Sequence, residues 1–537
     1  MTDDTGKSPV ALRKAKADRA WQQHSGWEHL YQDAHDYVIP YRKSGGMSAS
    51  KQISDKIFDM TGPNSAMHLA GTLQRLLFSQ PPALRAGGLV RVEKSRRGAD
   101  GLRELEKLDR ALERTGEFMY PFMEAGNLDT ATHEMCIDLG FGTGVLIPMR
   151  GTADRPIVFH APAAHEVALG GDAYGETTLV SWKRMVPKDG LLEAFPNGNF
   201  SKEFRDSCKN SPSAEVALYQ DFWKQPDGTW AFGAYVEQHC PNFIAFERYR
   251  TKPVATPRYY RVAGEMRGRG PILMALPSIK VQNKAQELVL KSGAIQMLGI
   301  WGYRGTFNPD TVSLEPGMFL SMQSTGGVMG PDLVRLDPAA GRLDIASMLL
   351  EGNAQQIRDA MMDTRLPNET GTPKSASEIA ARMEQNKGVH MGGFMRLWRE
   401  VYPDIVPRCA EILASFGYLS GVMDFNQLLV SVGVRSPMAA AVDADKVGGI
   451  ARYAEMMNAL VGPAKLPEHL DLDKAGDAIA DAMMIPKNMV PDSEQRAEIR
   501  KALQAQQQQA VESEAMVKAA PNIAAGGLRM IEGGMAA

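Results

Sequence analysis

The feature that most constrains this chain is the stretch Gly264–Lys387, in which two long helices enclose a glycine-rich, strand-like insert. The first helix is predicted over Ala275–Leu298, the insert over about Gly299–Ala340, and the second helix over Leu343–Met362. At 1.5 Å per residue, each helix is roughly 30 Å long. The pattern therefore predicts two long helices with a small β module between them.

A short polar loop, Asp363–Lys374, follows the second helix. Ser375 and Glu378 then have the spacing of a capping box, in which each side chain satisfies a backbone N–H of the first helical turn. We therefore expect a third helix to begin at Ser375 and to run to about Asn386.

Three lysines of the first long helix, Lys280, Lys284 and Lys291, are spaced at offsets of 4 and 7 residues. At 3.6 residues per turn these offsets place all three on one stripe of the helix surface. Such a stripe is either a solvated face or a basic row that faces a polyanion, and the sequence leaves both interpretations open.

The N-terminal quarter of the chain reads as helical. Residues 1–18 carry mixed charge and predict a flexible arm. The helices that apolar periodicity predicts are Ala20–Tyr37, Pro63–Phe78, Leu102–Glu124 and Asp129–Leu139. Asn127 is the expected N-cap of the last one, because a short polar side chain there accepts a backbone hydrogen bond.

Beyond Gly140 the pattern becomes strand-like. No Gly-x-x-x-x-Gly-Lys-Ser/Thr motif occurs, so Gly140–Gly144 predicts a tight turn into a strand and not a nucleotide loop. The predicted strands are a hairpin of Glu166–Leu169 and Thr177–Val186, then a meander of Leu218–Trp223, Trp230–Val236 and Phe243–Tyr249. Residues 20–265 therefore form an α+β domain, helical first and β later.

The C-terminal part is again mostly helical. Gly392–Phe416 predicts helix with interruptions at Pro403 and Pro407, since proline removes a backbone donor. The remaining predicted elements are a strand over Gln427–Val434, helices over Asp443–Leu460 and Leu472–Met483, and a polar, marginal helix within Ser493–Lys518.

Composition limits the class of protein. The 537 residues suggest three or four domain-sized units, and 44% hydrophobic with 23% charged residues is ordinary for a folded protein. No apolar run reaches the length of a membrane span, and Met1–Asp18 is polar and charged, so we expect neither a membrane span nor a secretory signal. The cysteines are widely separated and predict buried thiols; they are Cys136, Cys208, Cys240 and Cys409.

The charge balance and the motifs point away from tight DNA binding and from catalysis. A net charge of −3 excludes a repressor-like grip on DNA but permits a conduit through which a duplex slides. His133-Glu134 lacks the second histidine of a zinc helix, and His160 and His165 have no partner ligands in sequence. We therefore expect no catalytic residue, no metal and no cofactor.

Four stretches together resemble a known family. They are Tyr37–Arg42, Ile57–Pro63, Arg267–Leu298 with its β insert, and Ser375–Arg382. In this order they resemble the head-to-tail connector (portal) proteins of short-tailed, T7-like bacteriophages. The resemblance covers about residues 20–510.

The resemblance implies a mostly helical α+β portal fold with wing, stem, clip and crown regions. Twelve copies would form a ring at one capsid vertex and make the channel for packaging and ejecting double-stranded DNA. The implied partners are further copies of the chain, DNA of any sequence, a packaging ATPase (terminase), a tail adaptor, and the capsid and scaffolding proteins, with no membrane. The implied location is the virion, after synthesis in the host cytoplasm, and the implied protein is not an enzyme.

The resemblance also implies where the family's regions lie in this chain. The arm is residues 1–18, the wing 19–270, the first stem helix 271–298, the clip 299–342 and the second stem helix 343–362. The tunnel loop follows at 363–374, then wing and crown at 375–470, and crown with tail at 471–537. The tunnel loop supplies the first candidate DNA contacts, and the lysine stripe supplies the second. The loop candidates are Arg365, Asn368, Thr372 and Lys374, and the candidate docking residues of the clip are Phe307, Pro316 and Met318.

Two other classes remain open from the sequence. One is a hydrolase built on residues 140–265, in which case mutation of His160 or His165 would abolish turnover. The other is a scaffolding or interaction protein without a channel.

Overall fold

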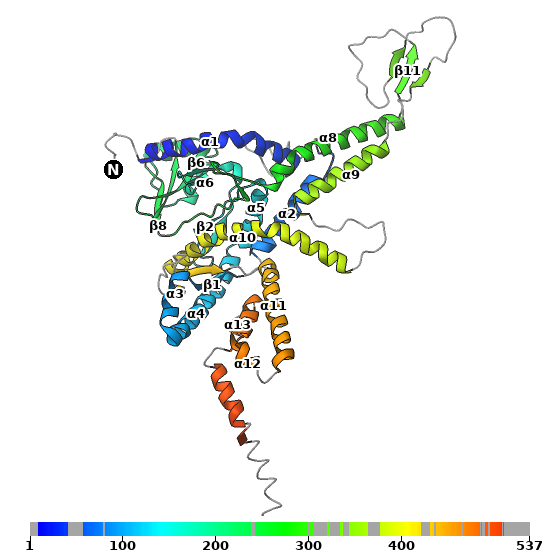
Figure 1. Cartoon of the computed structure of the whole chain (residues 1–537). Coiled ribbons are helices and arrows are strands. Elements are labelled where there is room, and N and C mark those ends of the chain that lie inside the picture. Colours follow the sequence, from blue (N-terminus) through cyan, green and yellow to red (C-terminus); the bar gives the residue numbers. More distant parts are fainter. Residues whose placement is uncertain are drawn as a thin grey trace, which may run out of the picture. The chain divides into compact units, whose positions relative to one another are not determined.

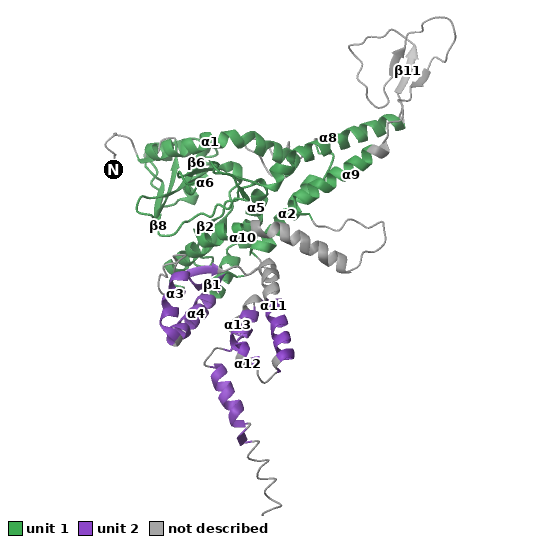
Figure 2. Cartoon of the chain, in the orientation of Figure 1, with its two compact units in different colours: residues 1–82, 117–425 green, residues 83–116, 426–537 purple. Residues whose placement is uncertain are grey.

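Two units make up the part of the chain that the computed structural model describes (Figure 1). The first comprises Met1–Pro82 and Glu117–Phe425, and the second comprises Ala83–Gly116 and Asn426–Ala537 (Figure 2). The described residues are 9–40, 57–78, 81–237, 242–298, 300–304, 319–322, 333–336, 343–363, 376–419, 430–433, 437–462, 466–483, 485, 489–491, 495–506 and 508–509.

An antiparallel sheet of five strands forms the centre of the first unit, in the order β4-β5-β6-β7-β8. The strands are β4 (Val167–Gly171), β5 (Thr177–Pro187), β6 (Glu215–Lys224), β7 (Trp230–Val236) and β8 (Ala245–Tyr249). Every residue of β7 is buried, as expected of a strand covered on both faces. The predicted hairpin and meander are confirmed.

Two short helices that the sequence analysis missed, α6 (Lys188–Ala194) and α7 (Lys202–Asn210), lie between β5 and β6. Ser201 caps α7, because its Oγ accepts a hydrogen bond from the Phe204 N–H at 3.1 Å. Leu191 and Phe204 are buried in one cluster with Phe222 of the sheet. These helices therefore close one side of the core.

The long helix α1 (Pro9–Tyr37) packs against β4 and β5. The flexible arm predicted for residues 1–18 is therefore wrong over residues 9–18. Val10, Arg13 and Ala17 recur at helical spacing and are all buried, so this segment gains enough packing to hold a helix. Residues 1–8 lie outside the described ranges.

Three further predicted helices are confirmed as α2 (Thr61–Phe78), α4 (Gly98–Ala125) and α5 (Leu128–Phe141). Asn127 precedes α5 in a left-handed conformation (φ 64°), but its side chain does not cap the helix. Instead its amide exchanges two hydrogen bonds of 3.0 Å with the backbone of Phe159 in β3 (Ile157–His160), which pairs with β2 (Ile147–Arg150). Asn127 is thus the N-cap residue, as predicted, but the expected side-chain capping bond is absent because this side chain bonds to β3 instead.

The helix–sheet–helix order predicted for residues 271–362 is confirmed. Helix α8 (Pro271–Leu298) leads into β11 (Ile300–Arg304), β12 (Phe319–Met322) and β13 (Leu333–Leu336), and α9 (Leu343–Ala360) follows. β11 is the central strand, parallel to β12 and antiparallel to β13. α8 and α9 lie side by side (Figure 1).

Helix α10 (Ala376–Ser415) is a single helix of 40 residues. The predicted end near Asn386 and the predicted interruptions at Pro403 and Pro407 are wrong. Val401, Tyr402 and Val406 beside the prolines are buried. Burial of this face therefore outweighs the loss of one hydrogen bond at each proline.

The second unit is smaller. β1 (Ala83–Ala86) pairs antiparallel with β14 (Val430–Gly433), which confirms the predicted late strand. Buried Asp109 accepts hydrogen bonds from the Ala86 N–H and from Arg91 Nη2, both at 2.7 Å. The remaining helices are α3 (Gly88–Arg96), α11 (Pro437–Val461), α12 (Leu466–His469) and α13 (Leu472–Ala482).

Candidate channel and assembly surface

The base of α8 is fixed by close contact between two glycine-rich segments. The Gly270 N–H donates to the Phe141 carbonyl at 2.8 Å, and the Gly268 N–H donates to Thr143 Oγ1 at 2.8 Å. A Cβ on Gly270 would lie 2.1 Å from the Gly140 carbonyl oxygen, which no side chain can tolerate. Glycine is therefore required where the chain enters α8.

Arg267 ties the same base to α1. Its guanidinium is buried and donates to the Tyr31 hydroxyl at 2.7 Å and to the Ala164 carbonyl at 3.1 Å, with a further bond to the Val167 carbonyl. These hydrogen bonds to three separate elements hold Arg267 in place at the start of α8. We call the pair of helices α8 and α9 the rod.

A polar ladder joins α8 to α9 and to the segment before α2. Asn283 Oδ1 accepts from the N–H groups of Phe58 and Asp59 at 2.7 and 3.1 Å, and Gln282 Nε2 donates to Asp59 Oδ2 at 2.8 Å. Asn353 of α9 completes it, since its Nδ2 donates to Gln282 Oε1 at 2.9 Å. Gln282 and Asn283 are buried, so these bonds fix the register of the two helices.

The chain leaves α9 through a buried anchor. Met362 has a left-handed backbone (φ 56°), and Ser65 Oγ of α2 donates to Asp363 Oδ2 at 3.0 Å. His68 Nδ1 lies 3.8 Å from the other carboxylate oxygen. Asp363, the first residue of the predicted tunnel loop, is therefore held by the body of the first unit.

Most of the predicted site residues lie outside the described ranges. These are the loop residues Arg365, Asn368, Thr372 and Lys374, the clip residues Phe307, Pro316 and Met318, and Ser375 of the predicted capping box.

The three stem lysines are described, and each has a carboxylate partner. Lys280 Nζ lies 2.5 Å from Asp33 of α1, whereas Lys284 and Lys291 share Glu287 at 2.9 and 2.8 Å. The side chains of Lys284 and Lys291 are 64% and 63% exposed. Around Glu287 the two exposed lysines leave an excess of one positive charge.

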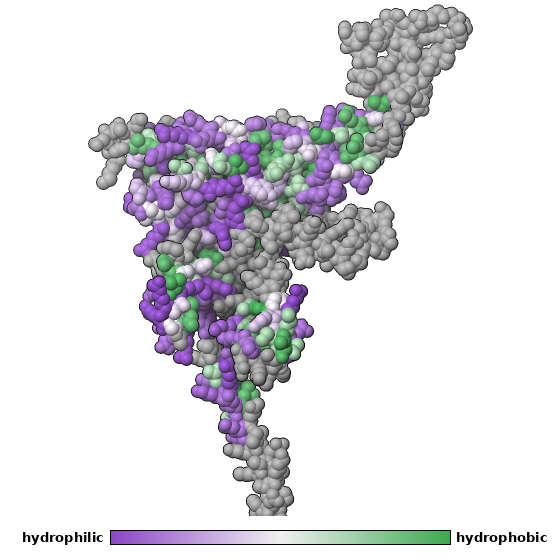
Figure 3. Space-filling model, in the orientation of Figure 1, coloured by the Kyte–Doolittle hydropathy of each residue, from purple (hydrophilic) through white to green (hydrophobic). Residues whose placement is uncertain are grey.

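Both rod helices also expose apolar side chains. Those of α8 include Met274, Val281, Leu288 and Leu290, and those of α9 include Met348 and Leu349. Figure 3 shows apolar patches between polar side chains over these two helices. Exposed apolar side chains of this kind mark a contact surface when they form one continuous patch.

In the C-terminal half of α10, three carboxylates bind the segment between β8 and α8. Glu400 accepts from the Arg258 N–H at 2.7 Å, Asp404 from Lys252 Nζ at 2.6 Å, and Glu411 from Thr251 Oγ1 at 2.6 Å. Burial raises the pKa of Asp404, and the Lys252 ammonium opposes that shift. Helix α10, which follows the predicted tunnel loop, is thereby connected to the segment that follows the last strand of the five-stranded sheet.

The hydrolase alternative depends on His160 and His165, and both side chains pack against other aromatic rings. His160 packs near Trp182, with 6.2 Å between ring centroids, and burial together with Arg184 lowers its pKa. The His165 carbonyl accepts from His24 Nε2 at 3.0 Å. Among the described residues no group of three or more His, Cys, Asp or Glu side chains is arranged to hold a metal ion.

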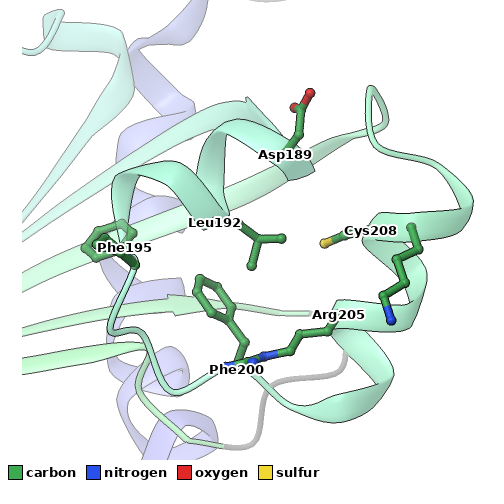
Figure 4. A pocket seen from close by; sticks show the side chains of 8 residues that line it. Asp189, Leu192, Phe195, Phe200, Arg205 and Cys208 are labelled. Carbon is green, nitrogen blue, oxygen red and sulfur yellow. The ribbon is translucent and has the colours of Figure 1, made fainter.

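A pocket of about 370 Å³ lies between α6 and α7 (Figure 4). Its lining is apolar, chiefly Leu192, Phe195 and Phe200, and Asp189 and Arg205 add charge. Cys208 also lines it and is itself buried. This pocket is an apolar recess in the sheet domain and contains none of the predicted site residues.

None of the helices in the described ranges combines the length and hydrophobicity that a membrane crossing requires. The described part of the chain is an α+β body with two adjacent long helices, α8 and α9, joined by a small sheet, which is the order of elements expected of a portal-type protein. The family described as "Bacteriophage head to tail connecting protein" matches residues 12–490, so the chain belongs to that family. It is a head-to-tail connector and a component of the virion.

The chain is also similar to individual phage and phage-like proteins. The "Probable portal protein" of Bordetella phage BPP-1 is 25% identical over 423 residues, which is 74% of each chain. Among solved structures, a chain in the virion of a native gene transfer agent particle is 12% identical at a TM-score of 0.28 and covers 79% of this chain and 91% of its own. A chain in the neck of the native particle, with C12 symmetry, is 12% identical at a TM-score of 0.29, covering 78% and 94%. These TM-scores are too low to show a common arrangement of the whole chain.

Sequence reasoning missed the anchoring residues Asp59, Gln282, Asn353 and Asp363. The available signal was the pair of consecutive amide side chains, Gln282 and Asn283, which follow the apolar residue Val281 in α8.

Proposed function

We propose that this connector assembles into a ring, of twelve copies, around a channel for double-stranded DNA in a short-tailed phage. The observation that carries the proposal is the α8–α9 rod, whose register and base are fixed by the polar ladder and by Arg267. A rigid rod repeated about an axis lines a channel of constant width. The wing would be residues 19–270 and the clip residues 299–342. Residues 375–470 would belong to the wing and crown, and residues 471–537 to the crown and tail.

The DNA contacts would come first from the tunnel loop, residues 363–374, through Arg365, Asn368, Thr372 and Lys374. Asp363 supports this role because its buried anchor fixes the point at which the loop begins. Duplex DNA carries one charge per ~1.7 Å of axis, so two cations per copy, repeated around a ring, guide it without a strong grip. The stem lysines Lys280, Lys284 and Lys291 are weaker candidates, since each is paired with a carboxylate.

The β11–β13 module would be the clip, where the packaging ATPase docks first and the tail adaptor later. Its candidate docking residues remain Phe307, Pro316 and Met318. The module supports this role because it joins the two rod helices through a separate small sheet. Capsid and scaffolding proteins would contact other faces of the ring.

Deletion of Gly371–Pro373 tests the loop assignment. We expect rings of normal size from the variant chain, together with a large loss of packaged or retained DNA in particles. Gly293→Ala, on an open face of α8, is the control and should package normally. A deletion variant that packages and holds DNA like the unmodified chain would remove the loop from the channel.

A further inference from the structure

Three exposed apolar residues of α8 lie at strict heptad spacing. Met274, Val281 and Leu288 are 64%, 65% and 56% exposed, and each follows the previous one by seven residues. Single exposed apolar residues are normal on a protein surface. Three of them in one line over two heptads are typical of a seam against another helix. We call these three residues the α8 seam.

The α8 seam points away from the side of the helix that packs on its own unit. At about 100° per residue, Leu276 and Ile279 lie about 140° and 160° around the helix from Val281. Both are buried, at 4% and 3% exposure. The seam is therefore not covered by the described residues of its own unit.

The other rod helix presents a complementary surface. Met348 and Leu349 of α9 are 77% and 68% exposed, and Glu351, one turn beyond Met348, is also exposed. On α8, Lys284 lies one turn beyond Val281 and is 64% exposed. α8 and α9 run in opposite directions (Figure 1), and on α8 Leu288 follows Lys284 by one turn, whereas on α9 Met348 precedes Glu351 by one turn. In an antiparallel pair Leu288 can therefore lie against Met348 while Lys284 lies beside Glu351, and the two charges are opposite.

We infer that the α8 seam binds a second copy of this chain, and that it packs on Met348 and Leu349 of α9 in that copy with Lys284 beside Glu351. This inference rests on the proposed ring. A cyclic assembly joins two different faces of the subunit, so a seam on α8 and a complementary patch on α9 can close it. Lys284 then faces the neighbouring copy and not the DNA.

The first test places a charge on the seam. Val281→Glu and Leu288→Glu each introduce a carboxylate at a position more than half exposed, so the monomer should keep its circular dichroism spectrum. We expect the concentration for half-assembly, measured by mass photometry, to rise at least tenfold in each variant. Leu290→Glu is the matched control, since Leu290 is 52% exposed and lies about 180° around α8 from Val281. The control should assemble within about twofold of the unmodified chain.

The second test identifies the occupant. Chains with Leu288→Cys are mixed with chains with Met348→Cys and oxidised, and we expect a disulfide that links one of each kind. Lys284→Glu should weaken assembly severalfold, and the added change Glu351→Lys should restore it, because the pair is then reversed.

Three results would overturn the inference. They are normal rings from the Val281→Glu and Leu288→Glu chains, an equal loss in Leu290→Glu, or crosslinks only between two Leu288→Cys chains. If the unmodified chain forms no ring at all, the proposed function itself is wrong. Intact rings from the seam variants would instead contradict only the inference about the α8 seam.

Discussion

Ser65 donates a hydrogen bond of 3.0 Å to Asp363, 298 positions later in the chain, and both side chains are buried. Ser65 lies in the first turns of α2, and Asp363 is the first residue of the proposed tunnel loop and its one described residue. This single bond therefore connects the helical core to the point where the proposed channel loop begins.

Ser65→Ala should loosen the start of that loop. Removing one donor from a buried carboxylate costs about 1–3 kcal/mol, which corresponds to roughly 5- to 160-fold faster local opening. Hydrogen exchange of the amides at residues 357–363 measures this change. Ser25→Ala is the control, because the Ser25 hydroxyl is exposed and only bonds the Gln22 carbonyl within its own helix. Unchanged exchange in Ser65→Ala would show that Asp363 is held by other contacts.

Arg13→Met should detach the N-terminal half of α1 from the sheet. Arg13 Nε lies 3.2 Å from Asp221 Oδ2 in a buried pair, and Tyr235 donates to the same oxygen at 3.1 Å. Burial raises the pKa of Asp221 and the Arg13 charge opposes that rise, so the variant leaves a buried carboxylate without its cation. We expect a loss of about 3–5 kcal/mol in the protection of α1 from hydrogen exchange.

Lys14→Met provides the comparison for this pair. Lys14 pairs with Glu237 on the surface, where the two side chains are 26% and 53% exposed, and such pairs contribute about 0–1 kcal/mol. Equal effects of Arg13→Met and Lys14→Met would show that the buried pair has no special role.

Substitution by alanine should change the stability of the protein in opposite directions at Gly270, just before α8, and at Gly293, within α8. Gly270→Ala places a Cβ 2.1 Å from the Gly140 carbonyl oxygen and should destabilise the fold by about 3 kcal/mol or more. Gly293→Ala meets open space in the helix and should stabilise α8 by up to about 1 kcal/mol. Thermal unfolding of the two variants checks both signs. A Gly270→Ala chain as stable as the original would disprove the close contact at the base of α8.

His24 should make stability depend on pH. Burial, followed by the Arg267 charge, lowers its pKa from 6.5 to about 3. The unfolded chain therefore binds a proton more readily than the folded chain. Stability from this group is complete above about pH 6.5 and decreases as the pH falls, by roughly 2 kcal/mol at pH 5.

His24→Gln tests this dependence while keeping a donor for the His165 carbonyl. Urea unfolding at pH 7 and pH 5, followed by tryptophan fluorescence, should show a smaller acid-induced loss in the variant. The same loss in both chains would assign the pH dependence to other groups.

Local pattern was sufficient to predict much of this fold. The meander was predictable because Asp227 and Gly228 specify the turn between β6 and β7, where Asp227 Oδ1 accepts from the Thr229 N–H at 2.9 Å. Helices α8 and α9 were predictable because each is long and bounded by glycine-rich or polar segments. The continuous helix α10 was not, since its prolines are tolerated only through burial of Tyr402 and its neighbours.

The candidate site was less accessible to sequence reasoning because its bonds join distant positions. Asp59 and Gln282 are 223 residues apart, and Lys280 finds Asp33 at a separation of 247. Helical periodicity placed the three lysines on one stripe but gave no information on their acidic partners. The α8 seam was visible as spacing, yet only burial of the opposite face distinguishes it from a core stripe.

Electron microscopy of the purified, unmodified chain tests the central proposal most directly. The account predicts rings with a central hole wide enough for a double helix, lined by the α8–α9 rods. Solid particles, or rods packed inward as a closed bundle, would contradict it.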